Sequence, residues 1–159
     1  AEDLGDKYVL LHPTAQSARP LEDIENAALA KYLQDENIPT ARAVHWGHLR
    51  LPNGQIARSY WKEKGKVEDL RMARNVKATV HAKPDFAEIQ FYFRFQGNLE
   101  DDQAEPETLA MVSRYSKPDA QLLKDSFGTV ISCKYQGADN LAVIPVKDIK
   151  SVVGMVPHS

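Results

Sequence analysis

Cysteine, tryptophan and long apolar runs are all scarce in this chain. Cys133 is the only cysteine among 159 residues, so no internal disulfide can form and a metal site built from several cysteines is excluded. No apolar run approaches the ~20 residues that a membrane-spanning helix needs. Glu2, Asp3 and Asp6 interrupt the apolar residues at the start, so we expect no signal peptide there. These absences predict an intracellular protein, with a nuclear location as one option, and no membrane partner.

A strong excess of charge of either sign is also missing. The formal net charge is −2, which argues against a surface dominated by phosphate binding but leaves room for a local basic patch. The apolar share of 43% and the charged share of 26% are those of a soluble globular protein. A chain of 159 residues suits one domain with its own core.

Catalytic motifs are absent as well. The sequence contains no phosphate-binding glycine loop and no Rossmann glycine pattern, and its serines lack the context of a nucleophile elbow. His45 and His48 would face opposite ways on a strand, so we interpret them as ordinary histidines rather than zinc ligands. The acidic run Glu100–Glu107 is typical of a solvated loop. We therefore predict no catalytic residue, no cofactor and no metal, and we keep a metal-dependent nuclease as the second alternative function.

What is present in the first half is one helical pattern among short strands. Pro20 suits the first turn of a helix, and apolar side chains then recur at helical spacing, which predicts the main helix over about Leu21–Asp35. Lys7–His12 is a predicted strand, and the acidic end Ala1–Asp6 is predicted to fray. The Pro-Asn-Gly-Gln turn signal predicts a β-hairpin over His45–Trp61.

The second half is a succession of apolar runs. Alternation predicts a strand over Asn75–His81 and another over Phe86–Phe95, with Ile89 on the same face as Phe91, Phe93 and Phe95. Further strands are predicted over Leu109–Tyr115, Thr129–Tyr135, Leu141–Val146 and Ile149–Val156. The predicted fold is mainly β (α+β), a small, partly open β-barrel or sandwich with one main N-terminal helix. We predict a single domain over residues 1–159, in which residues 1–81 hold the first strand, the helix and the hairpin and residues 82–159 form the β core.

Two segments of the β core resemble a bromo-adjacent homology (BAH) domain. They are Val112–Asp119, which is a strand followed by a Tyr-Ser-Lys-Pro-Asp turn, and the Ile-Pro-Val-Lys-Asp-Ile segment Ile144–Ile149. The resemblance covers roughly the last seventy residues. It implies a small β-barrel-like module that binds histone tails, nucleosomes or other chromatin proteins. Where the family reads methyl-lysine, an aromatic residue of the cage stands at the position of Ser116 here.

The chain as a whole also resembles a domain encoded in mushroom-type fungi alongside Kyakuja-Dileera-Zisupton (KDZ) transposons. The segments that carry this resemblance are Leu49–Ser59, Trp61–Glu63, Arg71–Val76 and Cys133–Gly137. The resemblance implies a transposon-associated fungal protein and says little about activity.

Three aromatic residues on the predicted hairpin and one on the core strand form the first candidate site. Rings on an open face bind a cation, a base or a sugar, and the other interpretation is that these rings fill the core. The candidate ligand-binding residues are Trp46, Tyr60, Trp61 and Tyr115.

The second candidate site is the basic middle third of the chain. If its side chains converge on one face, they would contact phosphate or an acidic partner. The other interpretation is a solvated charged surface. The candidate contact residues are Arg50, Arg58, Lys62, Arg71 and Arg74.

Taken together, the sequence predicts a non-catalytic interaction module. Its partner is expected to be a chromatin protein or a histone peptide, with nucleic-acid backbone contact in addition. The first alternative is a fungal carbohydrate-binding (lectin-like) or defence protein, in which the hairpin aromatics stack on sugar rings. A sheet edge ending in Ile149–Val156 also leaves homodimerisation open.

Overall fold

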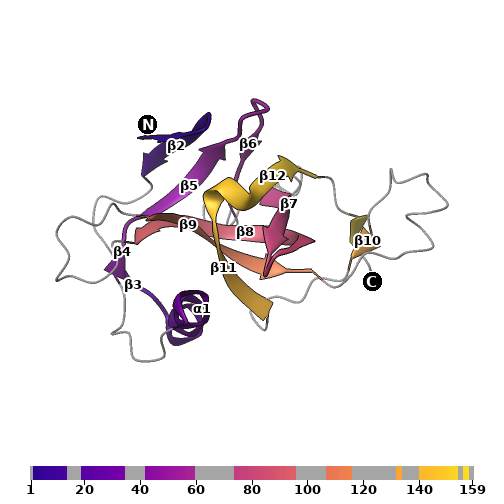
Figure 1. Cartoon of the computed structure of the whole chain (residues 1–159). Helices are drawn as coiled ribbons and strands as arrows, with labels where there is room; N and C mark the ends of the chain where they lie inside the picture. Colours follow the sequence, from indigo (N-terminus) through magenta and orange to yellow (C-terminus); the bar gives the residue numbers. More distant parts are fainter. Residues whose placement is uncertain are drawn as a thin grey trace.

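The computed structural model of the protein describes residues 2–13, 19–34, 42–59, 74–95, 107–115, 132–133, 140–153 and 156–157. These residues form a mainly β fold with one α-helix, as predicted (Figure 1). The central sheet has nine strands and is open rather than closed into a barrel. The predicted single-domain division stays a prediction.

The central sheet, the helix and one 3₁₀ turn consist of the following elements, given in chain order. They are β1 (Glu2–Gly5), β2 (Tyr8–Pro13), α1 (Asp23–Leu33), β5 (His45–Arg50), β6 (Ile56–Ala57), β7 (Asn75–Val80), β8 (Lys83–Phe95), β9 (Glu107–Arg114), β11 (Leu141–Pro145), the 3₁₀ turn η3 (Val146–Asp148) and β12 (Ile149–Val152). Two short pairs stand apart from it: β3 (Arg19–Pro20) with β4 (Arg42–Ala43), and β10 (Ser132–Cys133) with β13 (Val156–Pro157).

The long strand β8 organises the sheet. Its first half pairs with β7 and its second half pairs with β5 through Tyr92 and Phe93, while β9 runs antiparallel along its other edge. β11 extends the sheet beyond β9, and β12 extends it beyond β7. On the other side, β2 and β1 continue outward from β5. Because η3 joins β11 directly to β12, the chain crosses over one face of the sheet and encloses an interior.

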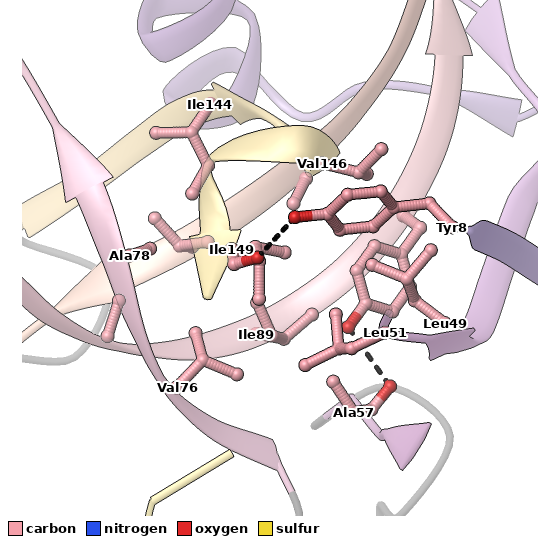
Figure 2. Close-up of a cluster of buried hydrophobic side chains, with 14 of the residues drawn as sticks. Tyr8, Leu49, Leu51, Ala57, Val76, Ala78, Ile89, Ile144, Val146 and Ile149 are labelled. Atoms are coloured by element: carbon pink, nitrogen blue, oxygen red, sulfur yellow. Dashed lines mark hydrogen bonds between the residues drawn. The ribbon is translucent and has the colours of Figure 1, made fainter. Parts of the chain in front are cut away.

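That interior is the larger of two hydrophobic cores, which we call the inner core. It gathers fully buried side chains from β2, β5, β7, β8, β9, β11 and β12. Figure 2 shows Tyr8 lying across this core with its hydroxyl directed at the backbone near η3. The Tyr8 hydroxyl donates to the carbonyl oxygens of Lys147 at 3.0 Å and Ile149 at 2.8 Å. Tyr92 is likewise buried, and its hydroxyl donates to the Ala57 carbonyl at 3.0 Å.

The second core, which we call the helix core, lies between α1 and the opposite face of β8, β9 and β11. Leu29 of the helix is fully buried in the same cluster as Phe93, Leu109 and Met111. The helix begins with a capping box in which Glu22 and Glu25 exchange backbone and side-chain hydrogen bonds. Helical spacing therefore predicted this element correctly, because one stripe of the helix is buried against a sheet.

The predicted hairpin is present over the residues that the structure describes. β5 pairs with β6, and Gly54 has a φ of +87° between them. The Gly54 amide donates to the Leu51 carbonyl at 2.9 Å, and the Leu51 amide donates to the Gln55 carbonyl at 2.8 Å. Asn53 also closes the turn, since its side-chain oxygen accepts from the Gln55 amide. The turn signal in the sequence thus identified the position where only glycine is unstrained.

Two expectations about individual strands were wrong. The acidic end does not fray throughout, because Glu2–Gly5 forms β1 and pairs with β2. Ile89 does not share a face with the three phenylalanines, because the register with β9 shifts between Ile89 and Phe91. Gln90 is the extra residue of this bulge, so Ile89 enters the inner core while Phe91 enters the helix core.

Several predicted segments lie outside the described residues. They include the acidic loop over residues 100–106, the Ser-Lys-Pro-Asp turn and most of the predicted strand Thr129–Tyr135. The predicted strands Leu109–Tyr115 and Leu141–Val146 correspond closely to β9 and β11. Pro145 ends β11, as expected of a residue that cannot donate to a strand ladder.

Candidate functional site

Two groups of charged and polar side chains among the described residues include residues of the predicted sites. The first, which we call the polar cluster, lies where β7, β8 and β9 run side by side. Asn75 pairs with Glu88 across β7 and β8, and Glu88 pairs with Ser113 across β8 and β9. All three residues are buried. Ser113 lies on the same face of β9 as Met111, which belongs to the helix core.

The polar cluster is held together by an ion pair. The Arg74 Nε donates to the Glu88 carboxylate at 2.7 Å, and the exposed fractions of the two side chains are 10% and 7%. The other carboxylate oxygen accepts from Gln90 at 3.1 Å. Tyr115 joins the cluster from the end of β9, because its hydroxyl donates to the Asn75 side-chain oxygen at 2.6 Å.

This arrangement changes the interpretation of Arg74. A guanidinium that is buried beside a carboxylate is committed to that carboxylate, since breaking the pair would leave an uncompensated charge away from water. Arg74 is therefore not displayed for phosphate contact in this structure. The cluster does bring Arg74 and Tyr115 together, although the sequence placed them in two different candidate sites.

The second place is an open hollow of about 390 Å³ between two hairpin turns. One is the turn between β1 and β2, where Asp6 and Lys7 both have positive φ. The other is the turn between β5 and β6. We call this site the mixed-charge hollow and define it by the side chains of Asp3, Lys7, Val9 and Arg50. In Figure 1 the strands β2, β5 and β6, which carry or adjoin its residues, lie together at the top, away from α1 at the bottom.

Strand register fixes the order of side chains across the hollow. Asp3 pairs with Val9 across β1 and β2, and Val9 pairs with Arg50 across β2 and β5. Directly opposed residues share a face, so these three side chains form one row on the outside of the sheet. Neighbouring strands are about 4.8 Å apart, which puts the backbones at Asp3 and Arg50 about 10 Å apart. Ile56 extends the row on β6 and is 44% exposed.

Some of the charged side chains around the hollow already have an ion pair or a hydrogen bond, and others have neither. The Asp6 carboxylate forms an ion pair with Lys147 at 3.1 Å. One carboxylate oxygen of Asp3 accepts a hydrogen bond from the Gly5 amide at 2.9 Å. Within the described residues, the side chains of Arg50 and Lys7 have neither an ion pair nor a hydrogen bond. Both are exposed. The hollow thus presents two uncommitted cations beside two carboxylates, Asp3 and Asp6, each of which is already partly engaged.

The predicted aromatic site is not assembled by the residues that the structure describes. Trp46 is only 8% exposed and packs in the inner core. It pairs with Tyr92 on β8, whereas the Tyr115 amide donates to Phe86, six positions earlier on that strand. Six strand residues span about 20 Å, so the two rings are at opposite ends of β8. Tyr60 and Trp61 lie outside the described residues.

The predicted basic residues also separate. Arg50 lines the mixed-charge hollow, and Arg74 lies in the polar cluster. Arg58 follows β6 and is half-buried, with interactions of its own. Lys62 and Arg71 lie outside the described residues.

The sequence analysis missed Asp3, Lys7 and Val9 as members of a site. Asp3 lies in the acidic end Ala1–Asp6, which was predicted to fray, although Gly5-Asp6 is itself a hairpin signal between short runs. Recognising the Gly-Asp turn would have paired the first residues of the chain with β2. It would then have brought an acidic and a basic side chain to one outer face.

The histidine and carboxylate side chains that the structure describes do not form a metal site. No three His, Cys, Asp or Glu side chains in the described ranges lie close enough to hold a metal ion. His45 is buried, its Nδ1 lies 3.1 Å from the Ala43 carbonyl, and its ring stacks on Phe91. In the part of the chain that the structure describes, no helix has both the length and the apolar character of a membrane span.

Comparison with known proteins adds no relative. No family model, no curated protein and no solved structure matches this chain.

Proposed function

We propose that the protein is a non-catalytic interaction module that binds a chromatin protein, with a histone tail as the preferred partner. One observation carries the proposal. The two segments that resemble a BAH domain begin in paired strands of the sheet, one at Val112 in β9 and the other at Ile144 in β11. β9 pairs with β11 over five residues, from Ser113 opposite Leu141 to Leu109 opposite Pro145.

The second segment, Ile144–Ile149, connects β11 to β12. Pro145 ends β11, η3 follows, and Ile149 returns to the inner core as the first residue of β12. The segment therefore carries the chain from one edge of the sheet to the other. Both segments thus begin in neighbouring strands of one sheet, as parts of a single module would. This adjacency supports the proposed kinship and, through it, the proposed partner.

Contact with a nucleic-acid backbone is a second component of the proposal. Lys77 and Lys150 are exposed on adjacent strands, β7 and β12. Lys77 faces away from the inner core, because its neighbours Val76 and Ala78 both enter that core. Lys150 is the irregular residue between the pairs formed by Ile149 and Ser151. Two neighbouring lysines on an open face can contact phosphate as point charges.

Binding of the full chain to reconstituted nucleosomes and to an array of histone peptides tests the proposal. We expect saturable binding to at least one histone peptide, and binding to nucleosomes that weakens as salt is raised. The matched variants are Lys77→Ala with Lys150→Ala for the backbone contact, and Lys83→Ala as an exposed control. Absence of binding on both formats would remove the proposed function. Binding that is unchanged in the double variant would remove only the nucleic-acid component.

A further inference from the structure

The mixed-charge hollow has features that the proposed function does not use. It lies on the outer face of β1, β2 and β5, away from the strands that carry the BAH resemblance. Its volume of about 390 Å³ falls in the range of pockets that hold small ligands or single side chains with their backbone. Its walls are two tight turns, and each turn is closed by hydrogen bonds or strand pairing of its own.

We propose that this hollow binds a peptide carboxylate, presented by an acidic side chain in an extended segment, with Arg50 as its main contact. An arginine fork matches a carboxylate because two N–H groups can donate to its two oxygens. Arg50 is exposed, and within the described residues its side chain has no competing carboxylate. Lys7 lines the same hollow and adds a second cation.

The rest of the row determines what else the ligand carries. Val9 separates Arg50 from Asp3 and gives an apolar floor between the two charges. Asp3 keeps one oxygen outside its bond to the Gly5 amide, so it can accept from a cation on the ligand. A segment with Glu and Lys on either side of a small residue therefore satisfies both ends of the row. This match does not require the partner to be a chromatin protein.

The same geometry disfavours a phosphate. A phosphate dianion beside Arg50 would share the hollow with the carboxylates of Asp3 and Asp6, and like charges repel. Asp6 is already neutralised in part by Lys147, but Asp3 has no ion pair among the described residues. A monoanionic carboxylate meets less repulsion and leaves room for a ligand cation. A peptide with a carboxylate side chain and inorganic phosphate are therefore the two probes that show which kind of anion the hollow binds.

The experiment follows amide chemical shifts by NMR while the full chain is titrated to millimolar levels with the acetylated, amidated tripeptide Glu-Ala-Lys. We expect saturable shifts at the amides of Lys7, Val9, Arg50 and Gly54, and smaller shifts with the Gln-Ala-Lys peptide or with inorganic phosphate. Arg50→Ala should weaken binding about fivefold or more, as expected for one charge-assisted contact at an exposed site. Lys83→Ala, which removes an exposed cation from β8, should leave the titration unchanged.

Three results would overturn the proposal. They are an absence of localised shifts at millimolar peptide, shifts of equal size in the Arg50→Ala variant, and phosphate binding at least as strong as peptide binding. The spectrum of Arg50→Ala without ligand controls for folding, since an exposed side chain should be removable without disturbing distant amides.

Discussion

Arg50 and Arg74 look alike in the sequence and have opposite roles in the structure. Both belong to the basic middle third of the chain, and both were predicted to contact phosphate or an acidic partner. Arg74 is 8% exposed and forms a short ion pair with Glu88 in the polar cluster. Arg50 is exposed at the rim of the mixed-charge hollow, and its side chain has no partner among the described residues.

The comparison shows that register, more than residue type, decides whether a charge serves the fold or the surface. Asn75, the residue after Arg74, lies directly opposite Glu88, so the partner of Arg74 comes with the pairing of β7 and β8. Arg50 instead lies opposite Val9 and Ile56, neither of which can neutralise it. A buried charge must be paired, whereas an exposed charge can remain available to a ligand.

The largest expected effect is at the polar cluster. Glu88→Gln should destabilise the fold by about 3–5 kcal/mol, because it leaves the Arg74 guanidinium buried without its counter-charge. Urea unfolding followed by tryptophan fluorescence measures the change. The double variant Arg74→Met with Glu88→Leu should recover most of the loss, since it replaces the pair by apolar groups of similar size. A Glu88→Gln variant as stable as the parent would show that the cluster is not a buried charge pair.

The second largest effect is expected when the buried side chain of Leu29 on α1 is removed. Leu29→Ala should cost about 2–4 kcal/mol, because Leu29 is fully buried in the helix core and its loss leaves a cavity. Ile24→Ala is the matched control on the same helix, since Ile24 is 43% exposed and should change stability by less than about 0.5 kcal/mol. Thermal unfolding of both variants measures the difference. Equal losses would mean that α1 does not dock on the sheet through Leu29.

Because two tyrosine hydroxyls are buried in the inner core, we expect the free energy of unfolding to fall at high pH. Burial, with the nearby charges of Asp148 and Asp6, raises the pKa of Tyr8 above its ordinary value of 10.0, and burial alone raises the pKa of Tyr92 well above 10.0. A raised pKa means that the folded state holds its proton more tightly than the unfolded state. The stabilising contribution is therefore complete below about pH 10 and declines as pH rises from there toward the folded-state pKa.

Tyr8→Phe separates the hydrogen bonds from this titration. The variant should lose about 1–2 kcal/mol at neutral pH, because two carbonyl oxygens lose their shared donor. It should also lose less stability than the parent between neutral and alkaline pH, as measured by urea unfolding at each pH. An identical alkaline decline in the variant would show that the Tyr8 hydroxyl is not part of the linkage.

The turn beside the hollow gives the smallest effect. Gly54→Ala should destabilise the fold by about 1 kcal/mol, because φ at this position is +87° and a side chain is strained there. A Cβ at Gly54 would meet no atom within 4 Å, so the cost is one of backbone conformation rather than of packing. Urea unfolding measures this loss of stability. Asn53→Ala is the control variant, because it removes the side-chain hydrogen bond to the Gln55 amide in the same turn and leaves Gly54 in place. A neutral Gly54→Ala would contradict the assigned turn.

Much of the fold could be predicted from local patterns. Alternation identified β7, the Pro-Asn-Gly turn identified the hairpin of β5 and β6, and helical spacing identified α1, because each pattern depends on near neighbours. The bulge at Gln90 was not predictable in this way, because it depends on how β8 registers with β9. One extra residue there was enough to move Ile89 to the other core.

The candidate sites were harder to predict, and for the same reason. Nothing near Arg74 in the sequence marks Glu88 as its partner, and nothing near Arg50 marks Asp3 as a neighbour across two strands. For Trp46 the sequence left two interpretations, an exposed binding ring or a core ring, and its pairing with Tyr92 places it in the inner core. Such relations appear only once strands are paired.

The most direct test of this account is the free energy of unfolding of Arg74→Ala and Arg50→Ala, measured side by side in urea. The account predicts a loss of about 3 kcal/mol or more for Arg74→Ala, whose removal strands the buried Glu88 carboxylate, and a change within about 0.5 kcal/mol for Arg50→Ala. Losses of similar size in the two variants, or a larger loss for Arg50→Ala, would contradict the division between a charge that maintains the fold and a charge that is left for a ligand.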